Sequence, residues 1–285
     1  MKRGFNILLE ENERIDDLEY KGLKIIQNKN GFCFGIDSVL LSDFAKDIKK
    51  DAKVLDLGTG TGIISILLCA KTNLKHITGV EIQKQVYNMA KKSIELNNLE
   101  DKFEIINEDI KNIDKIFEPN SFDAIVTNPP YKKYNTGLKS KDETQLISRH
   151  EVMCNLEDIV RSASKLLNSN CSLYMVHRPD RIVDIIETLK KYKIEPKLIR
   201  FVYPKIGKEP NLLLIKATKG GKEFVKIEKP LIVYNEDGTY TDEILEIYNK
   251  KRKEKKMTRK IIFSCHTNRK LRGYHIKSNK SIKRS

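Results

Sequence analysis

The stretch Asp56-Leu57-Gly58-Thr59-Gly60-Thr61-Gly62 decides the fold of this chain. It follows the short apolar segment Ala52–Leu57 and precedes a second apolar segment that starts at Ile63. We therefore expect a buried strand, a glycine-rich turn and a helix in succession. Such a turn lets the backbone approach a ligand closely, with the N-terminus of the helix behind it.

Strand-like and helix-like segments alternate on the C-terminal side of this turn. Further strands are expected at His76–Glu81, Lys102–Asn107, Ser121–Thr127 and Cys171–His177, with helical segments between most of them. This alternation predicts an α/β, Rossmann-like fold with a mostly parallel seven-stranded sheet. The last two strands, 197–203 and 211–217, have a link too short for a parallel crossover, so the last strand should be antiparallel.

The chain divides into three parts by pattern and charge. Residues 1–48 contain a hairpin signal and then a helix that Asp37-Ser38 is expected to cap. Residues 49–248 form the α/β domain, and residues 249–285 form a basic, low-periodicity tail expected to be disordered when alone. Fifteen of the 54 Lys and Arg residues and only one acid, Glu254, lie in the tail, which therefore supplies nearly all of the net charge of +15.

Composition narrows the class of protein. The longest apolar stretch, Ile63 to Ala70, is interrupted by Ser65 and is too short to cross a bilayer, and the N-terminus has no apolar signal core. The five cysteines are scattered without a CxxC pair, which indicates reduced thiols and no zinc site. We expect a cytoplasmic protein without a metal, whose basic tail either contacts RNA phosphates or is simply solvated.

Three acids lie at or close to the ends of expected strands and suit a nucleoside ligand. The glycine turn alone is compatible with NAD, FAD, a phosphate or S-adenosylmethionine, but its spacing is GxGxG and Asp56 would repel a pyrophosphate. A ligand with an ammonium group and no phosphate, such as S-adenosylmethionine, fits better. Glu81 can accept ribose hydroxyls, and Asp109 can accept an adenine amino group or cap a helix.

Asn128-Pro129-Pro130-Tyr131 is the most specific signal. Two prolines fix φ and remove two backbone donors, so this turn presents acceptors at a strand end. An exocyclic amine needs acceptors, because accepting its two hydrogens with the Asn128 amide oxygen and the Pro129 carbonyl directs its lone pair at a methyl donor. Tyr131 offers a face on which a base stacks. The sequence therefore predicts amine methylation, without a metal or a strong base.

This combination resembles the amino-methyltransferases of the class I S-adenosylmethionine-dependent fold, over residues 30 to 218. The resemblance implies that Asn128, Pro129, Pro130 and Tyr131 are catalytic and that S-adenosylhomocysteine is the product. It also implies cofactor contacts from the following residues: Phe34, Asp56, Gly58, Thr59, Gly60, Gly62, Glu81, Ile82, Asp109, Ile110 and Asn128.

Two clusters, Phe32–Leu41 and Arg149-His150-Glu151, are similar to those of bacterial tRNA adenine-N6 methyltransferases that modify the anticodon-loop adenine of a valine tRNA. In that family the N-terminal element covers the cofactor. The resemblance implies a tRNA partner. The following residues are expected near the RNA: Lys132, Lys133, Arg149 and His150.

Three other functions stay open at this point. A guanine-N2 methyltransferase of ribosomal RNA needs the same amine chemistry. A release-factor glutamine methyltransferase shares the turn, although only 55 residues precede Asp56 here and that family carries a helical domain. A non-catalytic RNA-binding protein that keeps the fold is the alternative from outside the enzymes, and the intact Asn-Pro-Pro-Tyr turn argues against it.

Overall fold

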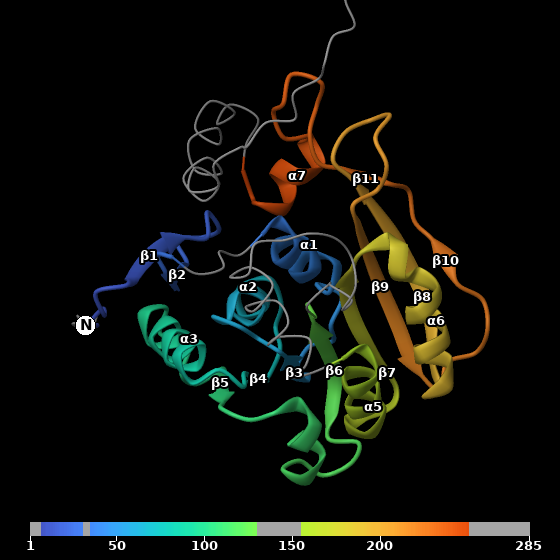
Figure 1. Ribbon diagram of the computed structural model, residues 1–285, viewed down its shortest axis with the longest axis horizontal. Coiled ribbons are helices and arrows are strands. Elements are labelled where there is room, and N and C mark those ends of the chain that lie inside the picture. The colour runs from blue at the N-terminus through green and yellow to red at the C-terminus, as the bar shows by residue number, and fades with distance from the viewer. Residues whose placement is uncertain (1–6, 31–34, 130–154, 251–285) are drawn as a thin grey trace, which may run out of the picture.

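The computed structural model describes residues 7–30, 35–129 and 155–250. Within these residues the central sheet has nine strands in the order β10-β8-β9-β7-β6-β3-β4-β5, with β11 also pairing with β8. Figure 1 shows this sheet running through the molecule, with helices on both faces. A separate two-stranded antiparallel hairpin, β1-β2, lies beside it.

The strands that build the sheet follow the expected alternation. Their bounds are β3 Lys53–Leu57, β4 His76–Val80, β5 Phe103–Ile106, β6 Phe122–Thr127, β7 Leu167–His177, β8 Ile194–Tyr203, β9 Leu212–Lys219, β10 Lys226–Ile227 and β11 Leu231–Ile232. Strands β3 to β7 pair in parallel, whereas β9 is antiparallel to both β7 and β8. The Rossmann-like α/β prediction is thus confirmed.

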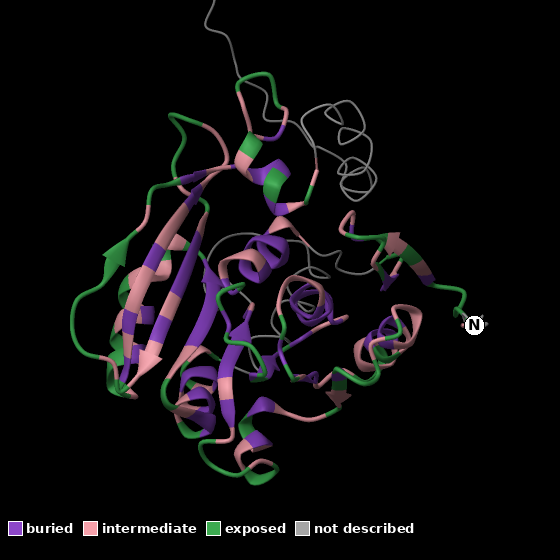
Figure 2. Cartoon of the chain, turned by 180° about the vertical axis from the view of Figure 1, so that it is seen from behind, coloured by how far each residue is buried: buried purple, intermediate pink, exposed green. Residues whose placement is uncertain are grey.

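Successive side chains along a strand point to opposite faces of the sheet. Because the sheet is buried on both faces, they join two different hydrophobic cores. Val54 of β3 joins the core under helices α1 (Ile36–Phe44), α2 (Ile63–Lys71) and α3 (Lys84–Leu96). Its neighbour Leu55 joins the core under α5 (Leu156–Leu166) and α6 (Ile182–Lys191). The buried residues fill the interior between these layers in Figure 2.

The chain segments outside the central α/β unit dock on one side of the sheet. Hairpin strands β1 (Glu13–Asp17) and β2 (Lys24–Asn28) lie on α3, where the backbone N–H of Ile26 donates to Ser93 Oγ at 2.9 Å. Helix α7 (Asp242–Ile247) packs on α1. Lys71 of α2 links α1 to α7, since its Nζ lies 3.3 Å from Asp43 Oδ1 of α1 and 3.0 Å from the Ile247 carbonyl oxygen of α7.

Two details differ from the sequence-based expectations. The sheet has two more strands than the seven expected, because the two-residue strands β10 and β11 add to β8 in parallel. Helix α1 is capped by Gly35, without a side-chain cap, so Asp37-Ser38 is not its cap. Both residues lie in the first turn of the helix, and their side chains serve the site described below.

Gly79 of β4 is packed so closely that a larger residue there should destabilise the protein. A Cβ atom on Gly79 would lie 2.8 Å from Thr59 Cγ2 and 3.0 Å from Phe103 Cε2, and both neighbours are buried. We expect Gly79→Ala to lower the free energy of unfolding by roughly 1–3 kcal/mol through overpacking. Urea denaturation checks this. An unchanged denaturation midpoint would contradict the packing described here.

No helix in the described ranges is both long and apolar enough to span a bilayer.

Candidate active site

Four neighbouring strands end at the same level of the sheet. Leu57 of β3 is in register with Val80 of β4 and with Thr127 of β6, and Val80 is in register with Ile106 of β5. The residues that follow these strand ends therefore lie along one edge, the carboxyl edge, where ligands of open α/β sheets bind. Most of the predicted site residues are here because of this register.

Asp56 is a fully buried carboxylate just before the glycine turn. Its Oδ2 accepts hydrogen bonds from Thr59 Oγ1 and Ser65 Oγ, both at 2.7 Å. Its Oδ1 is buried and has no hydrogen-bond partner among the described residues. Burial raises the pKa of Asp56 to about 6, and the charge of Glu81 adds to this rise while the two hydroxyls oppose it. A buried carboxylate oxygen of this kind suits a cationic or N–H donor from a ligand.

The glycine turn adopts the backbone that its sequence predicts. Gly58, Gly60 and Gly62 all have positive φ, at 74°, 60° and 89°, which side chains with a Cβ disfavour. A Cβ on Gly60 would meet nothing within 4 Å, so the turn has open space above it. The backbone N–H of Gly60 donates to Glu81 Oε2 at 3.1 Å, which ties the turn to the end of β4.

Glu81 follows β4 and is mostly buried. Its Oε1 accepts from the backbone N–H of Gln83 at 2.8 Å, so both carboxylate oxygens contact backbone donors. An ionised carboxylate offers about four acceptor positions, and these two backbone contacts use two of them. Asn107 holds the backbone here, since its Nδ2 donates to the Glu81 carbonyl oxygen at 2.8 Å.

Asp109 caps the short 3-10 helix η1 (Ile110–Lys115), with its Oδ1 accepting from the backbone N–H of Lys111 at 2.9 Å. Of the two roles expected for this residue, the structure thus shows capping. Ile110 is buried and faces the turn, because its Cδ1 lies 3.8 Å from where a Cβ on Gly58 would be. Ile82 is half-buried after Glu81.

Asn128 follows β6, and its amide nitrogen points at the first turn of α1. Nδ2 lies 3.2 Å from Asp37 Oδ2 and 3.1 Å from Ser38 Oγ. With the N–H groups directed at these two acceptors, the amide oxygen is the atom that can accept from a substrate. Pro129 is buried beside it. The end of β6 therefore holds the Asn128 amide against α1.

His177 is a site neighbour that the sequence did not single out. It ends β7, two residues beyond Met175, which pairs with Thr127 at the end of β6. Its Nδ1 accepts from the backbone N–H of Arg178 at 2.8 Å. Burial, together with nearby Arg181, lowers its pKa to about 4, so the ring is neutral at pH 7 and adds no positive charge to the site.

Some of the predicted site residues lie outside the described residues: Phe34, Pro130, Tyr131, Lys132, Lys133, Arg149 and His150. Two further groups were missed. Ser65 binds Asp56, and its signal was the single polar residue inside an apolar segment. Asp37 and Ser38 bind Asn128, but no local pattern connects positions about ninety residues apart.

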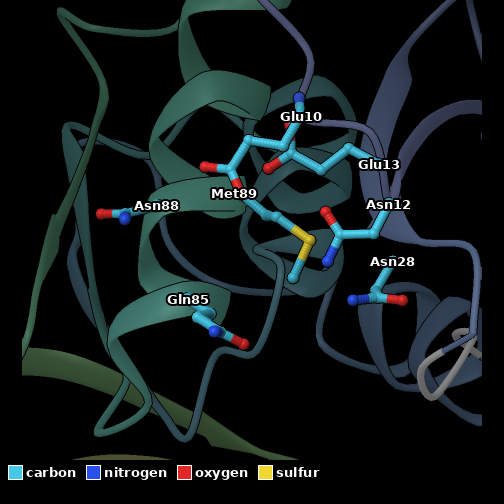
Figure 3. Close-up of a pocket in the computed structure, with 7 residues that line it drawn as sticks. All are labelled: Glu10, Asn12, Glu13, Asn28, Gln85, Asn88 and Met89. Carbon is cyan, nitrogen blue, oxygen red and sulfur yellow. Dashed lines mark hydrogen bonds between the residues drawn. The ribbon is translucent and has the colours of Figure 1, made fainter.

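A small polar cavity lies elsewhere, between the hairpin and α3 (Figure 3). It is lined by Glu10, Asn12, Glu13, Asn28, Gln85, Asn88 and Met89. None of these is a predicted site residue. Within the described part of the chain, no group of three or more His, Cys, Asp and Glu side chains is arranged to hold a metal ion.

Comparison with known protein families identifies the family to which this chain belongs. The family model of the methyltransferase small domain matches residues 35–192, which include the glycine turn, the three acids and the Asn-Pro-Pro-Tyr turn. The chain belongs to the methyltransferase small domain family. The expectation of a methyltransferase is therefore confirmed, and the match begins at Gly35, so it includes α1 with Asp37 and Ser38.

Individual relatives of this methyltransferase are similar over most of its length. A tRNA1(Val) (adenine(37)-N6)-methyltransferase of Flavobacterium johnsoniae is 26% identical over 230 residues, covering 80% of this chain and 96% of the relative. An enzyme of the same name from Histophilus somni is 28% identical over 229 residues, covering 80% and 93%. The resemblance to tRNA adenine-N6 methyltransferases noted from the sequence is thus confirmed.

Solved structures agree with the fold of this methyltransferase. A predicted O-methyltransferase from Agrobacterium tumefaciens superimposes with a TM-score of 0.61 at 21% identity, covering 75% of this chain and 95% of that one. The tRNA m1G37 methyltransferase of M. jannaschii gives a TM-score of 0.52 at 16% identity, covering 74% and 55%. At these identities the similarity concerns the fold alone.

Proposed function

We propose that this methyltransferase transfers the methyl group of S-adenosylmethionine to the exocyclic N6 amine of an adenine in tRNA, with the anticodon-loop adenine of a valine tRNA as the target. The observation that carries the proposal is Asn128, held at the end of β6 with its amide nitrogen on Asp37 and Ser38. This geometry suits recognition of an amine, and relatives named for adenine-N6 methylation are similar to the chain, at 26% and 28% identity.

The carboxyl edge fits S-adenosylmethionine. The buried Oδ1 of Asp56 suits the ammonium group of its methionine end, and Glu81 suits the ribose hydroxyls. Ile82 and Ile110 would flank the adenine ring of the cofactor. Asp109, which caps η1 through Oδ1, would also accept the adenine amino group. Residues 1–48 would cover the cofactor, with Phe34 as one of its contacts. When bound, the cofactor supplies an electrophilic methyl group on a sulfonium.

Asn128 and Pro129 perform the orientation step. An adenine amine is a weak nucleophile because its lone pair is delocalised into the ring. Accepting its hydrogens with the Asn128 amide oxygen and the Pro129 carbonyl makes the nitrogen tetrahedral and directs the lone pair at the methyl group. Tyr131 stacks on the base, worth roughly 1–3 kcal/mol. Positioning of the two reactants supplies much of the rate, about 7–11 kcal/mol in favourable cases.

RNA contacts come from basic residues around this edge. Lys132, Lys133, Arg149 and His150 follow the catalytic turn and would meet the RNA near the target base. The basic tail would grip phosphates, with a salt-dependent and sequence-independent contribution. An anticodon-loop base is already partly unstacked, so its extrusion costs less than flipping a base from a duplex. A tRNA substrate is also consistent with a cytoplasmic protein.

The buried Asp56 predicts a pH dependence for cofactor binding. The ammonium group needs the ionised carboxylate, whose pKa is raised to about 6. The affinity for S-adenosylmethionine should therefore be highest near pH 7 and fall by up to about tenfold per unit as the pH drops below 6. The stability of the ligand-free protein depends on pH in the opposite direction. The folded state binds the Asp56 proton more tightly than the unfolded state does, so Asp56 lowers the free energy of unfolding as the pH rises from 4 to 6.

Calorimetric titration at several pH values measures this dependence. Methylthioadenosine is the control, because it keeps the nucleoside but lacks the amino-acid end that would contact Asp56. Its affinity should change much less over the same pH range. An equal loss of affinity for both ligands would contradict the placement of the ammonium group at Asp56.

The substrate class is tested by offering labelled S-adenosylmethionine with unmodified total tRNA, ribosomal RNA or a release factor. The proposal expects label in tRNA. Label in ribosomal RNA would favour the guanine-N2 alternative, and label in the release factor would favour glutamine methylation. Cofactor binding with no transfer to any of them would favour a non-catalytic RNA-binding protein.

A further inference from the structure

The side chain that recognises the amine is itself held by a carboxylate from another part of the chain. Asn128 Nδ2 lies 3.2 Å from Asp37 Oδ2, and Ser38 Oγ provides a second acceptor at 3.1 Å. Asp37 is 9% exposed and Ser38 5%, so water competes little for these contacts. The other carboxylate oxygen of Asp37, Oδ1, accepts from the backbone N–H of Ser38 at 2.9 Å and is thereby fixed to the helix.

An ionised carboxylate is an acceptor only, so it selects one of the two orientations of the Asn128 amide. If the amide were turned over, its oxygen would face Asp37 Oδ2, and two acceptors would repel each other. The NH₂ group must therefore face α1. The amide oxygen is then directed away from Asp37 Oδ2, and in the proposed function this oxygen accepts the substrate amine.

The sequence around Asp37 makes room for this arrangement. A Cβ atom on Gly35 would lie 2.6 Å from Asp37 Oδ1 and 3.3 Å from Asp37 Cγ, so any larger residue displaces the carboxylate. The charge of Asp37 also acts on Tyr248, which follows α7. Burial raises the pKa of Tyr248, and the charges of Tyr234 and Asp37 add to that rise.

We propose that Asp37, assisted by Ser38, is a positioning residue for methyl transfer that fixes the rotamer of Asn128 and polarises its amide. This inference rests on the proposed function of Asn128 as the acceptor of the substrate amine. During transfer the amine gains positive charge. The Asp37 charge, passed through the Asn128 amide, makes the amide oxygen a better acceptor as that charge develops.

A double-mutant cycle tests whether Asp37 acts through Asn128. Asp37→Asn keeps an acceptor oxygen but removes the charge, and Asp37→Ala removes both. We expect kcat to fall by roughly 10-fold and 100-fold respectively, from the usual range for charged hydrogen bonds, with KM for S-adenosylmethionine unchanged. In an Asn128→Ala background both changes should alter kcat by less than about twofold. Equal effects in both backgrounds would overturn the inference.

A second variant moves the carboxylate without changing it. Gly35→Ala should lower kcat as Asp37→Ala does, because its Cβ displaces Asp37 Oδ1. Asp47→Asn is the matched control, since Asp47 bonds Tyr174 and Lys216 and not Asn128, and it should leave kcat unchanged. Unfolding curves of all variants show how much folded protein each one retains. If the decrease in folded protein accounted for the entire decrease in kcat, the inference would be overturned.

A readout independent of activity separates this inference from the proposed function. The side-chain amide protons of Asn128 are assigned by nuclear magnetic resonance from their absence in Asn128→Ala. We expect them to shift and to exchange faster with solvent in Asp37→Ala, but not in Asp47→Asn. Unchanged signals would overturn the inference even if tRNA is methylated. Changed signals without N6-methyladenosine formation would support the contact and contradict the proposed function instead.

Discussion

Asn128→Ala is expected to lower the rate of methyl transfer by about 100- to 1,000-fold, the usual cost of losing one preorganised hydrogen-bonding group at a reacting centre. The amide oxygen would no longer accept the substrate amine, while the cofactor would keep its contacts with Asp56 and Glu81. Single-turnover transfer to tRNA measures the rate, and calorimetry measures cofactor affinity, which should stay within about threefold.

Asn168→Ala is a matched control for this change. The Asn168 side-chain amide also donates to a carboxylate, Asp123 Oδ1 at 2.9 Å. Asn168 lies near the amino end of β7, however, at the end of the strands opposite to the candidate site. It should leave the transfer rate unchanged. If Asn168→Ala reduced the rate as much as Asn128→Ala, a general loss of folded protein would explain both results and the role of Asn128 would be wrong.

Asp56→Asn is expected to weaken binding of S-adenosylmethionine by at least about 30-fold, or roughly 2 kcal/mol, because a buried charge pair loses one partner. The same change should not destabilise the free protein near pH 8. A pKa raised from 3.8 to about 6 means that ionised Asp56 costs the fold roughly 3 kcal/mol there, and an unsatisfied amide costs about 1–3 kcal/mol.

The pair of measurements distinguishes a ligand site from a structural carboxylate. Urea denaturation gives the stability, and calorimetric titration gives the affinity. Asp123→Asn serves as the control, since Asp123 accepts from the backbone N–H of Lys53 at the other edge of the sheet and should leave affinity unchanged. A large loss of stability in Asp56→Asn would show that Asp56 supports the fold and would contradict its role toward the ammonium group.

The fold was predictable because its determinants are local. The apolar segments before and after the glycine turn specify β3 and α2, and the short link before 211–217 specifies an antiparallel β9. Strands β10 and β11 were not predictable. Each has only two residues, and their pairing with β8 supplies hydrogen bonds that no periodicity in the sequence marks.

The candidate site was predictable to the extent that its residues follow strands. Asp56, Glu81 and Asn128 come together because β3, β4 and β6 end in register. Asp37 was expected to cap a helix, since an acid before an apolar segment usually does so. In the structure Gly35 holds that position, and the Asp37 carboxylate instead binds Asn128. A tertiary contact between distant segments decides this role, and a single sequence carries no local signal of it.

Analysis of the methylated nucleoside tests the central claim most directly. Unmodified total tRNA is incubated with S-adenosylmethionine and the full-length protein, digested to nucleosides and separated by chromatography with mass detection. The account predicts N6-methyladenosine, absent when Asn128→Ala replaces the wild type. Methyl groups found on another nucleoside, such as N2-methylguanosine, or a tRNA that stays unmethylated would contradict the assignment of Asn128 to an adenine amine of tRNA.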